Sequence, residues 1–386
     1  MICAVLLAFG LQSYGQQADS ASRMMLYQRL SRPGLPPGIM TPPYKPTVGG
    51  ARTSQLSNDL AGKNDCGTFI TFDIPGAVST LPLAINPEGA IAGWYLDANS
   101  GYHGFLRSPH GTIITFDAPG AGTDPYQGTI PYAINPGGVI AGQYNDASYL
   151  YHGFLRTPDG TITTFDGPDG TELLALGINP SGTTTGTWYD SNRVQHGFLR
   201  AHDGTFTSFE VPGGAITDVY VNGIINPAGA ITGTLYEGSG FHGFLRTPDG
   251  TVTSFDAPGA QSYGFTFATS INPAGAIAGW FDDASYLVHG FLRARDGTFT
   301  RFDVPGAANG TLVGAINPEG AITGAYYDSN YVGHGYLRGN HGAFTTFDVP
   351  GATNGTYPSG INPAGAITGW YLDASYVNHG FLWTKH

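Results

Sequence analysis

The dipeptide His-Gly recurs through this chain at intervals of 44 to 49 residues, and this period constrains the fold more than any other feature. The histidines are His103, His152, His196, His242, His289, His334 and His379. An Ile-Asn-Pro tripeptide recurs in step, and so does a pair of Phe and an acidic residue. Self-similarity at such a period is typical of repeat architectures, in which each repeat is one supersecondary unit.

Turn signals divide each repeat into four short strands. In residues 256–303 we expect a strand that ends at Ile271, then strands over 276–281, 289–293 and 298–302, with an Asp-Gly turn before the last. Four antiparallel strands in about 45 residues match a propeller blade, whereas a β-helix coil is about half as long. The sequence therefore predicts an all-β fold, a seven-bladed β-propeller with four antiparallel strands per blade, over residues 68–386.

The phase of the repeat predicts how the ring closes. Residues 68–73 resemble a fourth strand but precede any complete blade, and the chain ends with a third strand at 379–383 that has no fourth strand after it. If the N-terminal strand completes the last blade, both are paired and no open sheet edge remains at that point. We therefore expect a ring closed in this way.

The repeats resemble those of the HAF family of extracellular repeat proteins, which is named for a His-Ala-Phe core. The matching residues are His103-Gly104-Phe105 and the preceding run from Ile85 to Gly93, and the resemblance covers about residues 68–386. Gly stands here where the family has Ala. The resemblance implies an exported β-repeat protein and supplies no catalytic residue.

The N-terminal region has a different character from the repeats. Residues 1–15 are apolar and uncharged, and they end in small residues that suit a signal peptidase, so we expect a signal peptide and an exported protein, extracellular or periplasmic. Residues 16–67 are predicted to be a Pro-rich, disordered linker. Cys66 is then the only cysteine of the mature chain, which predicts no internal disulfide.

Charge excludes one class of partner. The net charge is −12 and no Lys/Arg cluster is present, so we expect no nucleic-acid binding. Polysaccharide, another envelope component or a protein remain as partners, and we expect a monomer.

Residues that recur in every repeat are expected to build the scaffold, because a single catalytic site needs no sevenfold copy. The seven histidines are therefore interpreted as structural, each held by the acidic residue six positions earlier or by the acid of the Phe-acid pair. The Asn of Ile-Asn-Pro is expected to bond its local backbone in a turn.

The loops between the second and third strands place an acid at matching positions. These are Asp97, Asp146, Asp190, Glu237, Asp283, Asp328 and Asp373. One interpretation is an Asx-type turn that stabilises each hairpin. The other is a ring of carboxylates that holds Ca²⁺ or polar ligands, although one acid per blade does not obviously supply the six to eight oxygens that Ca²⁺ takes.

The connections between repeats vary in length and are the expected home of a ligand site. They are longest from Asp117 to Asn135, with 18 residues, and from Glu210 to Asn226 and Asp256 to Asn272, with 16. These loops contribute Asp124, Tyr126, Asp218, Tyr220, Tyr263 and Phe265. Aromatic faces beside carboxylates suit sugar rings, although the same rings can simply pad the loops.

Three tryptophans occupy one equivalent place in the second strand, namely Trp94, Trp280 and Trp370. Trp94 and Trp370 fall in neighbouring blades once the ring closes. They are interpreted as a stacking platform for a ligand or as packing between blades.

Three functions remain open from the sequence. We favour a non-catalytic propeller that binds carbohydrate or another envelope ligand through its variable loops, with no cofactor apart from the Ca²⁺ considered above. A carbohydrate-active hydrolase or lyase with its site at the channel mouth is the alternative from another class, because no spacing of acid pairs can be measured from residues alone. A structural or protein-interaction scaffold is the third.

Overall fold

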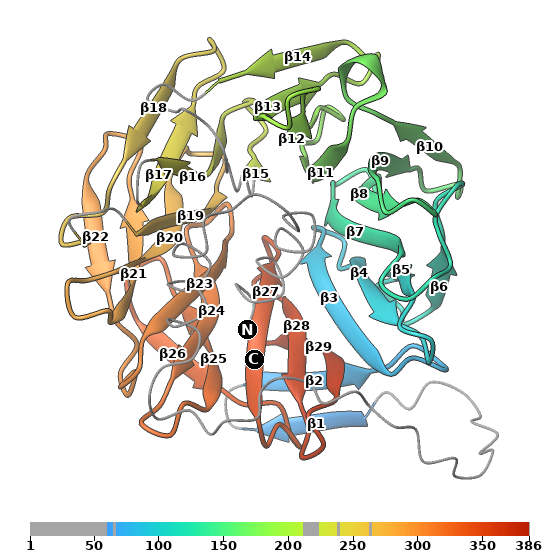
Figure 1. Cartoon of the computed structure of the whole chain (residues 1–386). Coiled ribbons are helices and arrows are strands. Elements are labelled where there is room, and N and C mark those ends of the chain that lie inside the picture. Colours follow the sequence, from blue (N-terminus) through green and yellow to red (C-terminus); the bar gives the residue numbers. More distant parts are fainter. Residues whose placement is uncertain (1–59, 65–66, 211–223, 238–239, 262–264, 386) are drawn as a thin grey trace. The chain divides into compact units, whose positions relative to one another are not determined.

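The computed structural model describes residues 60–64, 67–210, 224–237, 240–261 and 265–385, and most of them lie in short antiparallel strands (Figure 1). The one helical segment within these ranges is a 3-10 turn, η1 (Pro168–Gly170). Among the described residues, no helix has the length and apolar character needed to span a membrane. The chain is therefore all-β over its described part, as predicted.

The strands form four-stranded antiparallel units, one for each sequence repeat, and we letter the strands of a unit a to d in chain order. Unit 1 has β3 (Ser79–Ile85), β4 (Ile91–Leu96), β5 (Tyr102–Arg107) and β6 (Ile113–Phe116). Unit 2 has β7 (Gly128–Ile134), β8 (Ile140–Asn145), β9 (Tyr151–Arg156) and β10 (Ile162–Phe165). Unit 3 has β11 (Leu173–Ile178), β12 (Thr184–Tyr189), β13 (Gln195–Arg200) and β14 (Phe206–Phe209).

The second half of the chain repeats this pattern. Unit 4 has β15 (Ile224–Ile225), β16 (Ile231–Glu237), β17 (Gly240–Arg246) and β18 (Val252–Phe255). Unit 5 has β19 (Thr266–Ile271), β20 (Ile277–Asp282), β21 (Val288–Arg293) and β22 (Phe299–Phe302), which agree with the predicted strands to within one residue. Unit 6 has β23 (Thr311–Ile316), β24 (Ile322–Tyr327), β25 (Gly333–Arg338) and β26 (Phe344–Phe347).

The last unit takes its d strand from the other end of the chain. Unit 7 has β27 (Gly355–Ile361), β28 (Ile367–Leu372) and β29 (Asn378–Thr384), and β29 pairs with β2 (Gly67–Phe72) in the register Thr68–Thr384 to Phe72–Gly380. The predicted pairing of residues 68–73 with the third strand of the last unit is confirmed. A further strand, β1 (Leu60–Asn64), pairs with β2. It lies inside the segment predicted as linker, so the ordered sheet begins earlier than the repeat pattern indicated.

A β-bulge in the a strand explains one recurring glycine. The pairing of a with b shifts by one residue in units 1, 2, 3, 5, 6 and 7. The bulged strand comes so close that a Cβ at the facing b-strand glycine, such as Gly279, would collide with the carbonyl oxygen of Phe267. Glycine is therefore required there because the backbones approach each other closely.

The Phe of each Phe-acid pair packs between units. Phe116 on β6 lies under Gly104 of its own unit, where an added Cβ would come within 2.7 Å of the ring. On its other side the guanidinium carbon of Arg156, in unit 2, lies 4.9 Å from the centre of the ring. Equivalent Arg–Phe pairs join Arg107 to Phe72, Arg200 to Phe165, Arg246 to Phe209, Arg293 to Phe255 and Arg338 to Phe302. Each such cation–π contact contributes about 0.5–2 kcal/mol.

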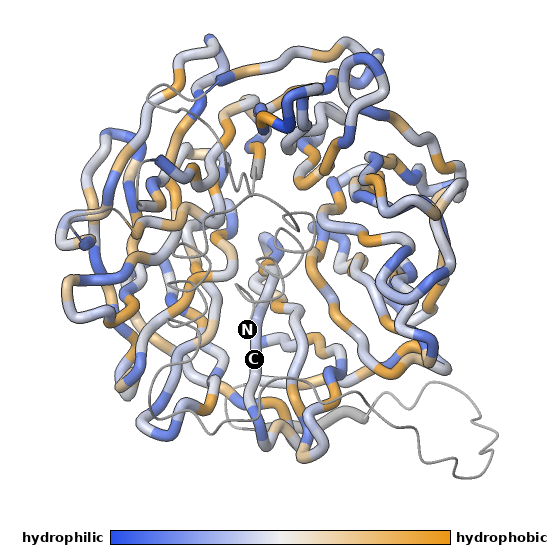
Figure 2. Tube along the Cα trace, viewed as in Figure 1, coloured by the Kyte–Doolittle hydropathy of each residue, from blue (hydrophilic) through white to orange (hydrophobic). Residues whose placement is uncertain are grey.

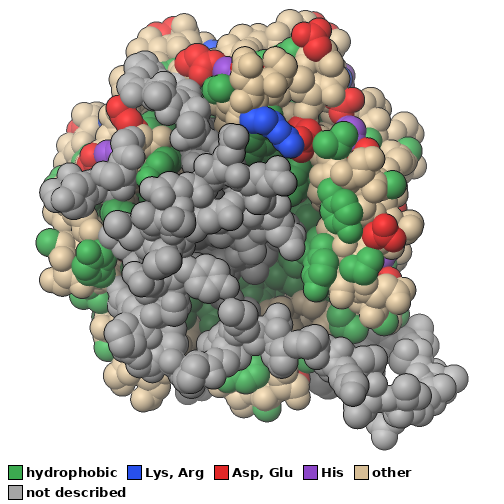
Figure 3. Space-filling model, in the orientation of Figure 1, with side chains coloured by type: hydrophobic (Ala, Val, Ile, Leu, Met, Phe, Trp, Pro, Cys, Tyr) green, Lys and Arg blue, Asp and Glu red, His purple; other side chains and the backbone are tan. Residues whose placement is uncertain are grey.

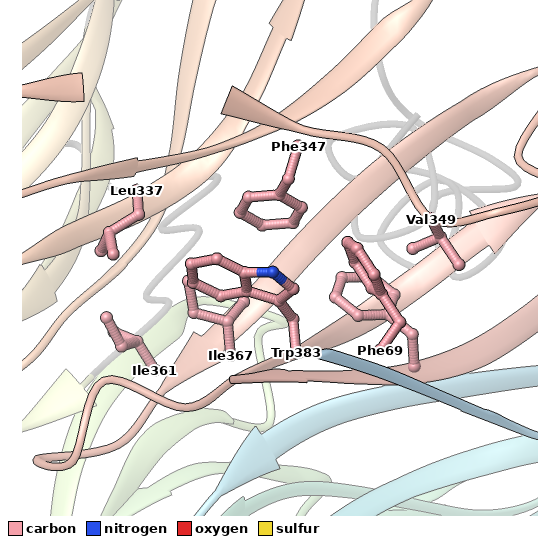
Figure 4. Packing of buried hydrophobic residues seen from close by; sticks show 8 residues of the cluster. Phe69, Leu337, Phe347, Val349, Ile361, Ile367 and Trp383 are labelled. Carbon is pink, nitrogen blue, oxygen red and sulfur yellow. The ribbon is translucent and has the colours of Figure 1, made fainter. Parts of the chain in front are cut away.

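Unit 7 replaces the arginine with a tryptophan. Trp383 stacks on Phe347 of unit 6, with ring centres 4.6 Å apart and planes inclined by 10°. Figure 4 shows the two rings face to face among Phe69, Leu337 and Ile367. Because Phe69 comes from β2, this cluster combines residues from both ends of the chain.

Buried asparagines link the units on the side of the a–b turns. The Oδ1 atom of Asn362 accepts the N–H of Ala366 in its own turn, as predicted, while its Nδ2 atom donates to the carbonyl of Asn86 in unit 1. The same bond to the next unit is made by Asn135, Asn226, Asn272 and Asn317. Figure 2 shows hydrophobic residues along strands such as β3, so polar links of this kind complement an apolar interior.

Candidate functional site

The repeated histidines are held by carboxylates on two sides. The Nδ1 atom of His289 lies 2.6 Å from Asp303 at the end of the d strand, and its Nε2 atom lies 3.2 Å from Asp283 in the b–c loop. Both partners that the sequence suggested are thus present in one unit. An aromatic residue of the b strand also stacks on the ring, in the pairs Tyr95–His103, Tyr144–His152, Trp188–His196, Tyr326–His334 and Tyr371–His379. These imidazoles therefore have little freedom to act on a ligand.

The b–c loop aspartates accept hydrogen bonds from the backbone of their own loops. Oδ1 of Asp97 accepts the N–H groups of Asn99 and Gly101 at 2.9 and 2.7 Å, an Asx-type turn, and Oδ2 lies 3.7 Å from His103. Burial opposes ionisation of Asp97, but the two N–H donors outweigh it and lower its pKa. The same turn is built on Asp146, Asp190, Asp283, Asp328 and Asp373. Within the described ranges, no three His, Cys, Asp or Glu side chains are grouped so as to hold a metal ion.

The three tryptophans at the equivalent position of the b strands, Trp94, Trp280 and Trp370, are buried. Trp94 packs edge-on against Tyr102, Trp280 stacks on Phe267 with ring centres 4.0 Å apart, and Trp370 lies beside Tyr357. The stacking platform suggested for Trp94 and Trp370 is therefore corrected, because neither ring has an open face.

The longest connection, between units 1 and 2, places two of the predicted residues, Asp124 and Tyr126, at the surface. The N–H of Tyr126 donates to Ser100 in the b–c loop of unit 1, and the hydroxyl of Tyr149, in the b–c loop of unit 2, donates to the carbonyl of Pro125. Asp124 is exposed and directly precedes Pro125 and Tyr126 in the chain. Its carboxylate has no hydrogen-bond or ion-pair partner among the described residues. We call Tyr102, Asp124, Tyr126 and Tyr149 the first tyrosine site.

The buried part of this site is held by the connection itself. The side-chain carbonyl of Gln127 accepts the N–H of Asp124, and the backbone carbonyl of Gln127 accepts the N–H of Tyr102. The ring of Tyr102 then lies 6.4 Å from that of Tyr126. Burial, with the neighbouring Tyr126 and Tyr151, raises the pKa of Tyr102, so its hydroxyl stays protonated at neutral pH.

The two exposed tyrosines adopt an unusual backbone conformation. Tyr126 and Tyr149 have φ angles of 66° and 63°, in the left-handed region, and are 50% and 51% exposed. Left-handed tyrosines also occur at Tyr286, Tyr331 and Tyr376, each in a b–c loop and each exposed. The equivalent positions hold Ser100 in unit 1 and Arg193 in unit 3, where Arg193 pairs with Glu172. The motif of Asp, two small or polar residues and Tyr was the available sequence signal, and it was missed.

Other predicted ligand residues lie elsewhere. Asp218, Tyr220 and Tyr263 lie outside the described residues. Phe265 is half-buried and forms a bridge with Phe241, and their ring centres are 5.7 Å apart. Phe265 therefore packs against unit 4 and is not part of the first tyrosine site.

Solved structures share this architecture. A streptogramin B lyase structure matches 81% of the chain and 96% of its own, at 14% identity and a TM-score of 0.55. The virginiamycin B lyase from Staphylococcus aureus matches 82% and 99%, at 14% identity and a TM-score of 0.50. The β-propeller domain of the Trilobed protease from Pyrococcus furiosus matches 80% and 96%, at 11% identity and a TM-score of 0.56.

The chain has a β-propeller fold. At these identities the likeness extends to the fold alone. No protein-family model matches the chain, and no protein of curated function matches it.

The two sides of the propeller differ in character. On the side of the a–b and c–d turns, an open hollow of about 320 Å³ lies between units 3 and 4, lined by residues of turns and strands that include Asn179, Pro227 and Arg246. Figure 3 shows hydrophobic side chains, a colour class that includes tyrosine, gathered over the region where Figure 1 places β3, β7 and β8. The first tyrosine site belongs to β5, β7 and the loops beside them, on the side of the b–c loops.

Proposed function

We propose that this protein is an exported, seven-bladed propeller that binds neutral carbohydrate at the first tyrosine site and does not convert it. The observation that carries the proposal is the pair of half-exposed, left-handed tyrosines, Tyr126 and Tyr149, which lie in and against the connection that also exposes Asp124. A left-handed backbone costs a non-glycine residue about 1–2 kcal/mol. Neither ring is buried in the fold, so the strain is not offset by packing and points to a role at the surface.

The chemistry of the site favours a sugar. Exposed aromatic faces stack on the apolar C–H faces of pyranose rings. The Asp124 carboxylate accepts hydrogen bonds from hydroxyl groups. No Lys or Arg occurs between residues 108 and 155, which disfavours anionic ligands.

The proposal that the ring is closed is supported by contacts between unit 7 and unit 1. The side chain of Ser359 donates to the carbonyl of Pro82, and Asn378 donates to Ser79. The Asn362–Asn86 bond and the Arg107–Phe72 pair add to these. Export rests on the apolar segment 1–15, and N-terminal sequencing of the protein from the culture medium or periplasm tests it.

The experiment is to incubate the full chain with cellulose, xylan, chitin, β-1,3-glucan and pectate, and to score retention and released fragments separately. We expect retention on a neutral polymer without fragments. Tyr126→Asn and Tyr149→Asn should each weaken retention at least tenfold, because Asn tolerates a left-handed backbone but offers no ring. The control is Ile114→Asn, at an exposed position of a d strand.

Each other outcome has a definite meaning. Released fragments establish a hydrolase or lyase instead. If neither tyrosine variant weakens retention, the polymer does not bind at the first tyrosine site. Failure of every polymer to retain the protein leaves the scaffold function as the better explanation.

A further inference from the structure

Units 6 and 7 carry a second pair of exposed tyrosines in almost identical loops. Tyr331 and Tyr376 have φ angles of 62° and 60° and are 40% and 64% exposed. Each follows an Asx turn, because Oδ1 of Asp328 accepts the N–H groups of Asn330 and Val332, and Oδ1 of Asp373 accepts those of Ser375 and Val377. The turn fixes the backbone that presents each ring to solvent.

An asparagine fastens each of these loops to the connection beside it. The Nδ2 atom of Asn309 donates to the carbonyl of Asp328, and that of Asn354 donates to the carbonyl of Asp373, both at 2.6 Å. The backbone N–H of each asparagine also donates to the last residue of the adjoining b strand, Tyr327 or Leu372. The two asparagines therefore hold equivalent loops in equivalent places, which preorganises the tyrosines.

A partly buried tyrosine, Tyr327, and a buried one, Tyr357, lie between the two loops. The rings of Tyr327 in unit 6 and Tyr357 in unit 7 are 6.4 Å apart. Tyr357 packs so closely against the backbone at Gly333, two residues after Tyr331, that a Cβ there would lie 2.7 Å from its ring. Its hydroxyl donates to the carbonyl of Asn354, and burial raises its pKa to about 12. Tyr357 thus contacts the end of the loop that carries Tyr331 and the asparagine that holds the loop of Tyr376.

We propose that Tyr331 and Tyr376 form a second carbohydrate site with two arms, each of which stacks one sugar ring of the same chain. The proposal rests on the chemistry of the proposed function but on different residues. The ligand is a neutral oligosaccharide, because residues 303–313, 326–334, 348–358 and 371–379 contain carboxylates and no Lys or Arg. Two arms on neighbouring units raise the effective concentration of a second sugar ring once the first is bound.

The test compares two double variants of the full chain on the polymers named above. Tyr331→Asn with Tyr376→Asn removes the second site, and Tyr126→Asn with Tyr149→Asn removes the first. We expect each double variant to weaken retention at least tenfold and the combination to abolish it. Asn330→Ser is the matched control, because unit 7 has Ser375 at that position and the turn is kept.

Two-armed binding gives a further signature. In a protein that already carries Tyr126→Asn and Tyr149→Asn, each single variant, Tyr331→Asn or Tyr376→Asn, should lose at least tenfold in affinity for the hexasaccharides cellohexaose, xylohexaose and chitohexaose, yet about twofold or less for the corresponding monosaccharides. Equal losses for both kinds of ligand would contradict two arms.

The outcomes separate the two sites. If the double variant of Tyr331 and Tyr376 binds like the wild type while that of Tyr126 and Tyr149 does not, the second site is wrong and the proposed function stands. If only the variant of Tyr331 and Tyr376 loses binding, the second site stands and the first is wrong. If no polymer or oligosaccharide binds the wild type, both fail.

Discussion

Two sets of positions recur in this chain with the same backbone geometry, and their side chains behave differently. In the sheets, the recurring Phe, Arg, His and Asn residues make the same contact in one unit after another, for example Arg156 with Phe116 and Arg338 with Phe302. In the b–c loops, the left-handed backbone recurs, but its side chain is Ser100 in unit 1, Arg193 in unit 3 and tyrosine in four other units. A constant contact indicates a requirement of the fold, whereas a constant backbone with a variable, exposed side chain indicates a position free to bind a ligand.

Substitutions should therefore separate stability from binding. Changes in the sheets should lower stability and leave the ligand affinity of the folded protein unchanged. Changes at the loop tyrosines should do the reverse. The following predictions test this contrast, from the largest expected effect to the smallest.

Phe302→Ala should lower the free energy of unfolding by about 3–5 kcal/mol, because the ring is buried and also packs under Arg338. Chemical denaturation measures the change. Ile114→Ala is the control, since its side chain is 48% exposed, and it should stay within about 0.5 kcal/mol of the wild type. Similar losses for both variants would show that the recurring Phe has no special place between units.

Gly290→Ala should cost about 1–3 kcal/mol, since the added Cβ would collide with the Phe302 ring. Gly339→Ala is the comparison, because the nearest atom to its Cβ is 3.7 Å away. The same denaturation series distinguishes them. A Gly290→Ala variant as stable as Gly339→Ala would show that the Ala of the HAF-type core fits here too.

Asn362→Ala should cost about 0.5–1.5 kcal/mol more than Asn86→Ala. Both variants lose the bond that Oδ1 makes within its own turn, but Asn362 also loses the bond from Nδ2 to the carbonyl of Asn86. Thermal unfolding of the two variants side by side gives the difference. Equal losses would indicate that the bond between units 7 and 1 adds nothing.

The contact between β2 and β29 should weaken as the pH rises. The hydrogen bond that Nδ1 of His379 donates to the carboxylate of Asp73 raises the pKa of His379 despite its burial, and Asp373 adds to the effect. A raised histidine pKa stabilises the fold fully below the unfolded value of about 6.5, and the gain is lost as the pH rises through the folded value. We expect His379→Gln to flatten the pH dependence of the melting temperature between about pH 5 and about pH 8. An unchanged slope would contradict this role.

Tyr149→Asn and Tyr331→Asn should leave stability unchanged or raise it by up to about 1 kcal/mol, because Asn relieves the left-handed strain. This is the smallest expected effect, and its sign matters most. A loss above about 1 kcal/mol would mean that these rings are structural after all, and the contrast between sheets and loops would fail.

Much of the fold could be predicted because each repeat contains the sequence signals of its own turns and strands. The Asp-Gly and Asn-Pro signals marked the turns, and the orphan strand at 68–73 marked the pairing with β29. The links between units could not be predicted, because the distance between Arg338 and Phe302, or between Asn362 and Asn86, depends on how the units pack. β1 was missed for a related reason: Leu60–Asn64 lacks a strand pattern of its own and is a strand through its pairing with β2.

Some residues of the proposed site were already candidates from the sequence. Asp124 and Tyr126 were found from the length of their connection, and the structure places them beside each other at the surface. The tryptophans were candidates for a stacking platform open to a ligand but are buried. Their equivalent position in the b strands does not show which face of the sheet is covered. Tyr149, Tyr331 and Tyr376 were overlooked, since a residue's φ angle is not visible in a loop whose composition is ordinary.

The most direct test of the account is a crystal structure of the full chain with the oligosaccharide that it retains. We predict density for sugar rings stacked on Tyr126 and Tyr149, and on Tyr331 and Tyr376, with the recurring histidines and asparagines unmoved. Density confined to the turn side, in the hollow lined by Asn179, Pro227 and Arg246, would contradict it.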